Sequence, residues 1–114
     1  MITQHVVSYG GDITLTRLPA GRADGFVWLF FVARGIEQIP GSGEGWRIRE
    51  HIKLTWLDGS AADVAFEGRT GEDSSPLFDV TVRDAGYNTL TIRYIEDGRI
   101  ISTENVALPV PPAA

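Results

Sequence analysis

The chain has 114 residues and no cysteine, so it is the size of one domain and contains neither disulfides nor thiolate metal sites. Its 10 basic and 15 acidic side chains give a net charge of −5, which argues against a nucleic-acid binder and a polybasic membrane anchor. Hydrophobic residues make up 43% of the chain, as in a globular domain rather than a disordered one.

Period-two alternation predicts two short strands near the N-terminus. The first covers residues 5–9 and stops at a Gly-Gly pair, and the second covers residues 12–18. In the second strand, Ile13 and Leu15 point inward and the intervening threonines point outward. Residues 19–25 contain a proline, two glycines and an aspartate, and are predicted as a turn region.

Residues 26–33 form the longest apolar run and are predicted as a central strand. Only one face of a strand meets the core of a two-layer sandwich, and the other face is normally polar. We therefore expect the second face to be covered, either by the following loop at residues 35–45 or by a protein partner. Alternation assigns Phe26, Trp28, Phe30 and Val32 to one face and Val27, Leu29, Phe31 and Ala33 to the other. The candidate partner contacts on this strand are Trp28, Leu29, Phe30 and Phe31.

Residues 46–58 fit two patterns. Apolar residues at even positions from Ile48 to Trp56 predict one long strand, although Ile48 and Ile52 also fit one helical turn. The β-rich end of the segment favours the strand. The Asp-Gly pair that ends it is predicted as a hairpin turn, because this pair tolerates a positive φ angle.

Two strands and a long loop are predicted next. Residues 63–67 place Val64 and Phe66 on one inward face. Residues 68–76 are rich in glycine, serine and acidic residues and are predicted as a loop. The alternation over residues 77–83 then predicts a strand whose inward side chains are Phe78, Val80 and Val82.

The last part of the chain predicts a hairpin. After a turn at residues 84–86, residues 87–96 alternate as a strand, and residues 99–106 return beside it. The Asp97-Gly98 pair between them is typical of a two-residue turn. The inward side chains of the first strand are predicted to be Leu90, Ile92 and Tyr94.

These elements predict an all-β, single-domain antiparallel β-sandwich of seven or eight strands, with a small barrel as the alternative. The domain covers residues 1–107. Residues 108–114 contain three prolines and are predicted as a proline-rich C-terminal tail.

The segment Asp84-Ala-Gly-Tyr87, followed by the hairpin of the last two strands, resembles a corner of immunoglobulin-like domains. The tyrosine comes one residue earlier than in that pattern, and the paired cysteines of such domains are absent. The resemblance covers about 25 of the 114 residues and is generic. It implies a sandwich fold and no particular function.

No catalytic, metal or cofactor motif is recognised. The two histidines, His5 and His51, do not form a metal-binding spacing, and no serine lies in a nucleophile elbow. The loop acids Glu72 and Asp73 are expected to be solvated, and they are candidates for contacts with a partner. We therefore predict that the protein is not an enzyme and holds neither a cofactor nor a metal.

Trp46 follows a glycine-rich loop, and two environments remain open for it. An exposed tryptophan can stack on a sugar or anchor a protein partner. Alternatively, Trp46 packs over the end of the sandwich. Trp28 and Trp56 are expected in the core because they lie in apolar strand patterns.

The function expected from the sequence is a structural or interaction domain that docks onto protein subunits, for instance as a bacteriophage virion accessory or decoration protein. The alternatives are a carbohydrate-binding module that uses Trp46, and an intracellular inhibitor that acts through the acidic second half of the chain. The N-terminus lacks the pattern of a signal peptide, and the longest apolar run is too short to span a membrane. Synthesis in the cytoplasm without membrane insertion is therefore expected.

Overall fold

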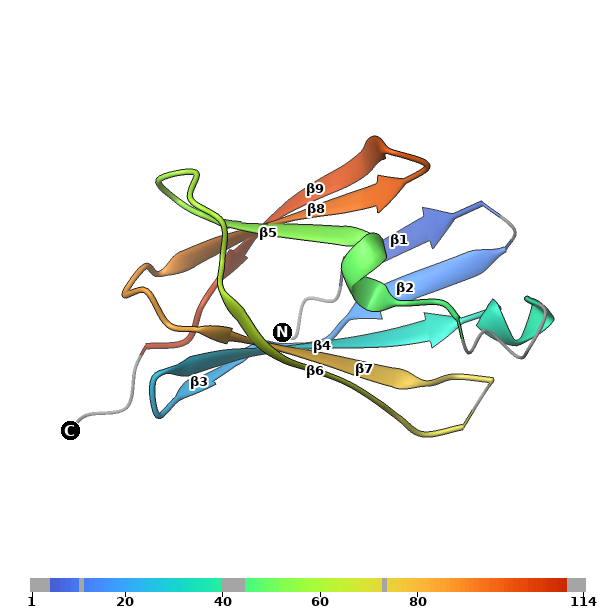
Figure 1. Cartoon of the computed structure of the whole chain (residues 1–114), viewed down its shortest axis with the longest axis horizontal. Helices are drawn as coiled ribbons and strands as arrows, with labels where there is room; N and C mark the ends of the chain where they lie inside the picture. The colour runs from blue at the N-terminus through green and yellow to red at the C-terminus, as the bar shows by residue number, and fades with distance from the viewer. Residues whose placement is uncertain (1–4, 11, 40–44, 73, 111–114) are drawn as a thin grey trace.

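A computed structural model describes residues 5–10, 12–39, 45–72 and 74–110, which form two antiparallel sheets packed as a sandwich (Figure 1). The six-stranded sheet has the order β1 (His5–Tyr9), β2 (Ile13–Arg17), β4 (Phe26–Arg34), β7 (Leu77–Arg83) and β6 (Val64–Thr70), with β3 (Gly21–Ala23) also paired to β4. The three-stranded sheet has the order β5 (Ile52–Trp56), β8 (Thr89–Glu96) and β9 (Arg99–Ala107). The predicted all-β sandwich is therefore confirmed.

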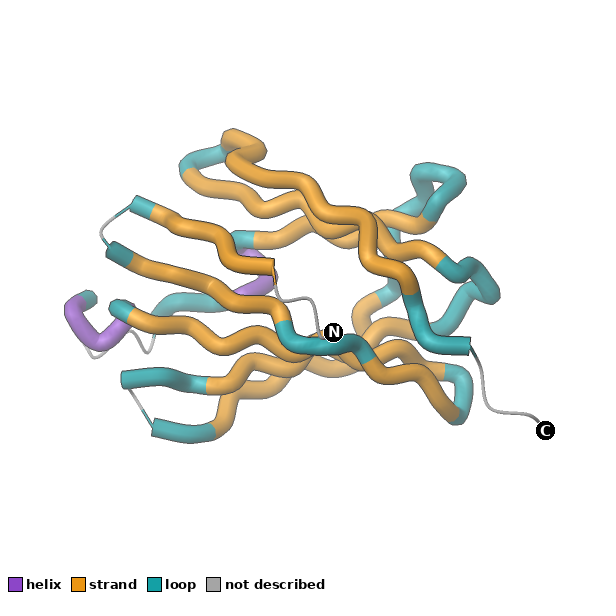
Figure 2. The backbone as a smooth tube through the Cα atoms, turned by 180° about the vertical axis from the view of Figure 1, so that it is seen from behind, coloured by secondary structure: helices purple, strands orange, loops and turns teal. Residues whose placement is uncertain are grey.

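The hydrophobic core fills the space between the two sheets, which the backbone trace shows as separate layers (Figure 2). Strand β4 supplies one complete face to this core, because Val27, Leu29, Phe31 and Ala33 are all fully buried. Strand β8 faces it from the other sheet with the three predicted inward residues, which are also fully buried. The alternation of β8 thus predicts its inward face correctly, whereas that of β4 separates two faces without identifying the inward one.

The β8–β9 hairpin turns at Asp97 and Gly98, as predicted. Both residues have positive φ angles, 50° at Asp97 and 76° at Gly98, as a two-residue turn of this kind requires. A Cβ atom at Gly98 would meet nothing within 4 Å, so the cost of a side chain there comes from the backbone conformation alone.

We expect Gly98→Val to lower the free energy of unfolding by about 1 kcal/mol or more, because a β-branched residue disfavours this φ angle. Chemical denaturation measures the change. Gly98→Asn is the matched control, since asparagine tolerates the left-handed region and should be less costly. A valine variant as stable as the original protein would contradict the turn assignment.

Four segments differ from the sequence-based predictions. The predicted turn region at 19–25 contains β3, and the predicted strand at 46–58 begins only at Ile52. Before it lies a 3₁₀ turn, η2 (Ile48–Glu50), in which the His51 N–H donates to the Ile48 carbonyl at 2.9 Å. This turn buries Ile48 completely, so the four-residue spacing to Ile52 reflected a helical turn.

The chain after the Asp58-Gly59 turn does not form the predicted hairpin. A single bridge joins Thr55 to Ala61, after which the chain crosses to the other sheet and pairs with β7. Strand β6 continues to Thr70, so the predicted loop at 68–76 begins later than expected. A bulge between Val64 and Phe66 shifts the register of β6 against β7.

The loop after β4 and the start of the predicted tail each bury one side chain in the core. The loop after β4 contains the short 3₁₀ helix η1 (Ile36–Gln38), whose Ile36 side chain is fully buried, while residues 40–44 lie outside the described part. Leu108, the first residue of the predicted tail, is buried and donates its N–H to the Asn88 carbonyl at 2.9 Å. Residues 111–114 of that tail lie outside the description.

Tyr87 does not make the contact that defines the tyrosine corner of immunoglobulin domains. In that corner the tyrosine hydroxyl bonds to backbone a few residues upstream. Here the Tyr87 hydroxyl donates to the Asp58 carboxylate at 2.8 Å, and its ring stacks on Trp56 at 5.9 Å. The structure thus shows a β-sandwich, and kinship with immunoglobulin-like domains stays a prediction.

Candidate binding surface

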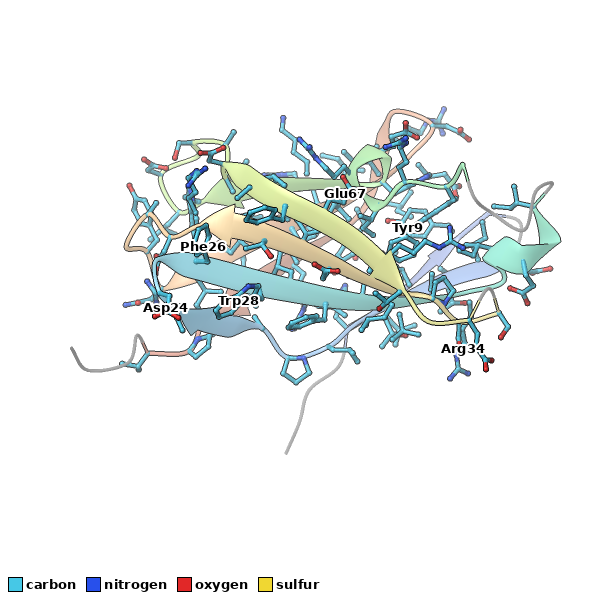
Figure 3. All side chains as sticks on the ribbon, turned by 60° about the horizontal axis from the view of Figure 1, so that its bottom comes forward. Tyr9, Asp24, Phe26, Trp28, Arg34 and Glu67 are labelled. Carbon is cyan, nitrogen blue, oxygen red and sulfur yellow. The ribbon has the colours of Figure 1, made fainter. Side chains whose placement is uncertain are left out.

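The outward face of β4 is apolar from Phe26 to Val32 and ends at the exposed Arg34. Its side chains alternate with the buried ones and are half-buried rather than covered. Figure 3 looks onto this side of the six-stranded sheet and labels two of these side chains, Phe26 and Trp28. The outward side chains are Phe26, Trp28, Phe30 and Val32.

Neighbouring strands extend this apolar surface. The register places Val32 opposite Leu77 on β7, and it places Trp28 opposite Thr81, which in turn lies opposite Phe66 on β6. Leu18 adjoins Phe30, because its N–H donates to the Phe30 carbonyl at 2.8 Å. We define the outer apolar face as Leu18, Phe26, Trp28, Phe30, Val32, Phe66 and Leu77.

Phe66 is the most exposed member of the outer apolar face, with 66% of its surface accessible. The sequence prediction that Phe66 points inward with Val64 is wrong. The bulge inserts one residue between them, and one extra residue in a strand moves every following side chain to the opposite face. No sequence pattern around Ala65 marks this bulge.

A hollow of about 450 Å³ lies on the same side of the sheet, between β2 and β4. The exposed Arg34 stands at its edge. The residues that line the hollow are Thr14, Thr16, Leu18, Val32 and Arg34.

Charged groups lie at another edge of the outer apolar face. Arg83 pairs with Asp63 at 3.0 Å, and its guanidinium lies 6.0 Å from the centre of the Phe26 ring. Both partners of this ion pair are more than half exposed. Asp79 on β7 lies opposite Phe30, so a carboxylate also lies within this face. Protein–protein interfaces usually combine apolar side chains with polar and charged ones in this way.

The outer face of the three-stranded sheet is polar over β5 and the middle of β8 and β9, and its exposed apolar residues, Ile100 and Ile101, lie at the start of β9. Arg93 donates to the Thr55 hydroxyl at 2.8 Å, and the Thr91 hydroxyl donates to Asn105 at the same distance. Lys53 and Thr103 lie opposite Arg93 on this face. The apolar outer face is therefore a property of one sheet and not of the sandwich as a whole.

The structure shows which face of β4 is buried and which points outward, a choice that the sequence left open. Leu29 and Phe31, which were candidate partner contacts, are fully buried in the core, whereas Trp28 and Phe30 lie on the outer apolar face. In the described part of the 35–45 loop, Ile36 and Ile39 pack against the core. Neither of them covers the outer apolar face.

Trp46 is buried, with 8% of its surface exposed, so the structure decides against the exposed alternative. The His51 ring stacks on it at 4.2 Å, and the rings of Tyr9 and Phe78 also contact it. Burial lowers the pKa of His51. Trp46 thus closes one end of the sandwich and offers no open ring face to a sugar.

Neither of the acidic candidates, Glu72 and Asp73, is shown in contact with the outer apolar face. Glu72 is exposed in the turn between β6 and β7, where its carbonyl accepts from the Ser75 N–H at 3.1 Å. Asp73 lies outside the described residues. Across the described ranges, no three His, Asp or Glu side chains are grouped as metal ligands.

A buried ionic cluster, missed by sequence reasoning, joins the two sheets between β2 and β9. Arg17 donates to both carboxylate oxygens of Glu104 at 2.5 and 2.8 Å, and the Tyr94 hydroxyl donates to Glu104 at 2.9 Å. Burial raises the pKa of Glu104, but the hydrogen bonds from Arg17 and Tyr94 outweigh it and hold the pKa below its ordinary value. The cluster closes this side of the sandwich with polar contacts.

None of the helices in the described part of the chain is both long enough and apolar enough to cross a membrane. The chain matches no protein-family model, and no curated protein or solved structure shows significant similarity to it.

Proposed function

We propose that the chain is a non-catalytic interaction domain that docks onto another protein through the outer apolar face. The observation that carries this proposal is the row of apolar outward side chains on β4, which the exposed Phe66 extends on the same sheet. A partner would bury the apolar surface that these residues leave accessible, most of it on Phe66, at roughly 25 cal/mol per Å². Aromatic residues also dominate the energetic centres of interfaces.

The hollow between β2 and β4 suggests what the partner presents. Its threonine and apolar walls fit an apolar side chain, and Arg34 at its edge fits a neighbouring carboxylate. The expected partner is therefore a protein surface with an apolar anchor beside an acidic residue. A virion subunit is one such partner, and that narrower identity stays a prediction.

Site-specific photo-crosslinking tests the proposal in cells that naturally make the protein. A photoreactive phenylalanine at position 30 should give a discrete protein adduct, because Phe30 lies in the outer apolar face. The same group at position 103, on the polar outer face, serves as the control. The adduct at position 30 should disappear when Trp28→Thr is added.

Three results would contradict this function. One is the absence of any adduct at position 30, and another is an equal adduct at position 103. The third is glycan-array binding that Trp28→Thr abolishes, since it would assign the face to a sugar. An adduct of twice the chain mass would instead identify the partner as a second copy, which sedimentation of the purified protein would verify.

A further inference from the structure

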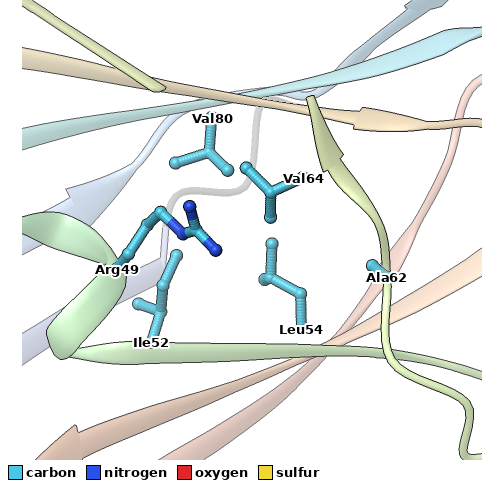
Figure 4. Close-up of a pocket in the computed structure, with 6 residues that line it drawn as sticks. All are labelled: Arg49, Ile52, Leu54, Ala62, Val64 and Val80. Atoms are coloured by element: carbon cyan, nitrogen blue, oxygen red, sulfur yellow. The ribbon is translucent and has the colours of Figure 1, made fainter. Parts of the chain in front are cut away.

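A hollow of about 150 Å³ opens between the two sheets on the side where β5 and β6 form the sheet edges (Figure 4). Four apolar side chains from β5, β6 and β7 line it, and the guanidinium of Arg49 points into it. The residues that line it are Arg49, Ile52, Leu54, Ala62, Val64 and Val80. The opposite side of the sandwich, between β2 and β9, carries the Arg17–Glu104 cluster instead.

The bulge in β6 accounts for the empty volume. A regular β6 strand would continue the inward face of Val64 with Phe66, two residues later. The bulge turns Phe66 to the outer side, and the inward positions after Val64 are taken by Glu67, opposite Val80, and Arg69. A large apolar side chain is thus missing from the wall where the two sheets diverge. Bulges of this kind are over-represented next to functional sites.

Arg49 places a positive charge beside the apolar side chains of this hollow. Its guanidinium points into the space beside Val80 and Ile52 (Figure 4), while 57% of the side chain remains exposed. Its nearest carboxylate is Glu67, at 3.9 Å from Nε, which is beyond hydrogen-bond distance. A ligand carboxylate could form the short bidentate contact that Glu67 does not make.

We propose that this hollow binds a small apolar carboxylate, with its ring or branched alkyl group among Ile52, Leu54 and Val80 and its carboxylate on Arg49. The volume fits one ring, because an engineered cavity of about 150 Å³ with similar walls in another protein binds benzene. The site lies on the inner side of the six-stranded sheet. It is therefore separate from the outer apolar face and does not depend on the function proposed above.

Titration with 3-phenylpropionate, followed by methyl NMR spectra of the whole chain, tests this site. The methyl signals of Ile52, Leu54 and Val80 should shift in a saturable way. The uncharged 3-phenylpropionamide, which has the same ring, should bind at least about tenfold more weakly because it lacks the charge-assisted contact. This comparison of acid and amide uses the unmodified protein, so it does not depend on a variant folding.

Four variants locate the contact. Arg49→Met keeps the apolar stem and should remove the difference between the acid and the amide. Arg99→Met is the matched control on the distant β8–β9 turn and should leave binding unchanged. Val64→Met should fill the hollow and abolish the methyl shifts. Trp28→Thr, on the outer apolar face, should bind the acid as the original protein does.

The proposal is overturned by several outcomes. These are the absence of saturable shifts at the three methyl groups, equal binding of acid and amide to the original protein, and an Arg49→Met variant that still prefers the acid. Binding that survives Val64→Met would also overturn it, because the ligand would then lie elsewhere.

Discussion

Replacing Phe31 with alanine should lower the free energy of unfolding by about 3–5 kcal/mol, because the ring is fully buried and its removal leaves a cavity in the core. Replacing Phe30, the next residue on β4, should cost only roughly 1–2 kcal/mol, because its half-buried ring gives up less apolar contact. Chemical denaturation of the two variants measures the difference.

The alanine variants of Phe30 and Phe31 serve as controls for each other, because both changes remove the same atoms from the same strand. Two matched double variants extend the comparison: Leu29→Thr with Phe31→Thr should unfold the protein, whereas Trp28→Thr with Phe30→Thr should leave it folded. Equal losses on the two faces would show that the outer apolar face is internal core. Monomeric behaviour at every concentration together with that result would remove the argument for a docking partner.

Replacing Asp84 with alanine should cost about 3–5 kcal/mol, because it leaves the charge of Arg22 buried without its partner. Only 2% of the Arg22 side chain is exposed, and it donates to both carboxylate oxygens of Asp84 at 2.7 and 3.0 Å. Arg22 also donates to the Pro109 carbonyl at 3.2 Å. The residue therefore links β3, the turn after β7 and the end of the chain.

Asp63→Ala is the matched control for Asp84→Ala. Its partner Arg83 also lies 3.0 Å away, but both side chains are exposed, at 62% for Arg83 and 70% for Asp63. Exposed ion pairs contribute about 0–1 kcal/mol, so this change should cost little. Similar losses for the two variants in urea denaturation would refute the distinction between the buried and the exposed pair.

The Arg22–Asp84 pair also predicts a pH dependence. The hydrogen bonds from Arg22 hold the pKa of Asp84 below its ordinary value in the folded state. The stabilising contribution is therefore present above the ordinary pKa of an aspartate, about 4, and is lost as the pH falls through the lower folded-state pKa. Asp84→Asn should flatten the acid side of the stability curve, and an unchanged curve would argue against this linkage.

Local sequence patterns were sufficient to predict which side chains point inward where the other face of the strand is polar. In β2, threonines alternate with Ile13 and Leu15, and both apolar residues are buried as predicted. The Asp97-Gly98 turn was equally local, because the tolerance of these two residues for positive φ angles does not depend on the rest of the chain. Fold class follows from such elements, since amphipathic strands must bury one face against another sheet.

Packing decided the environment of Trp46 and of the buried arginines. Trp46 is covered by His51 and Tyr9, whose position over it depends on the η2 turn and on the end of β1. Arg17 and Arg22 bind partners 87 and 62 residues away in the chain. A contact at such a separation leaves no periodic trace in the sequence, so these residues were missed.

The sequence by itself determined that the chain is a β-sandwich and that the strand at 26–33 is apolar on two faces. It did not determine which face lies inside, because alternation distinguishes two faces only when their polarities differ. The tertiary structure placed Phe31 in the core and Phe30 outside, and the β6 bulge placed Phe66 on the same outer apolar face, in line with Trp28 across β7. The bulge depends on pairing with β7 across the sheet, so the candidate binding surface and the apolar hollow are both products of strand packing rather than of local pattern.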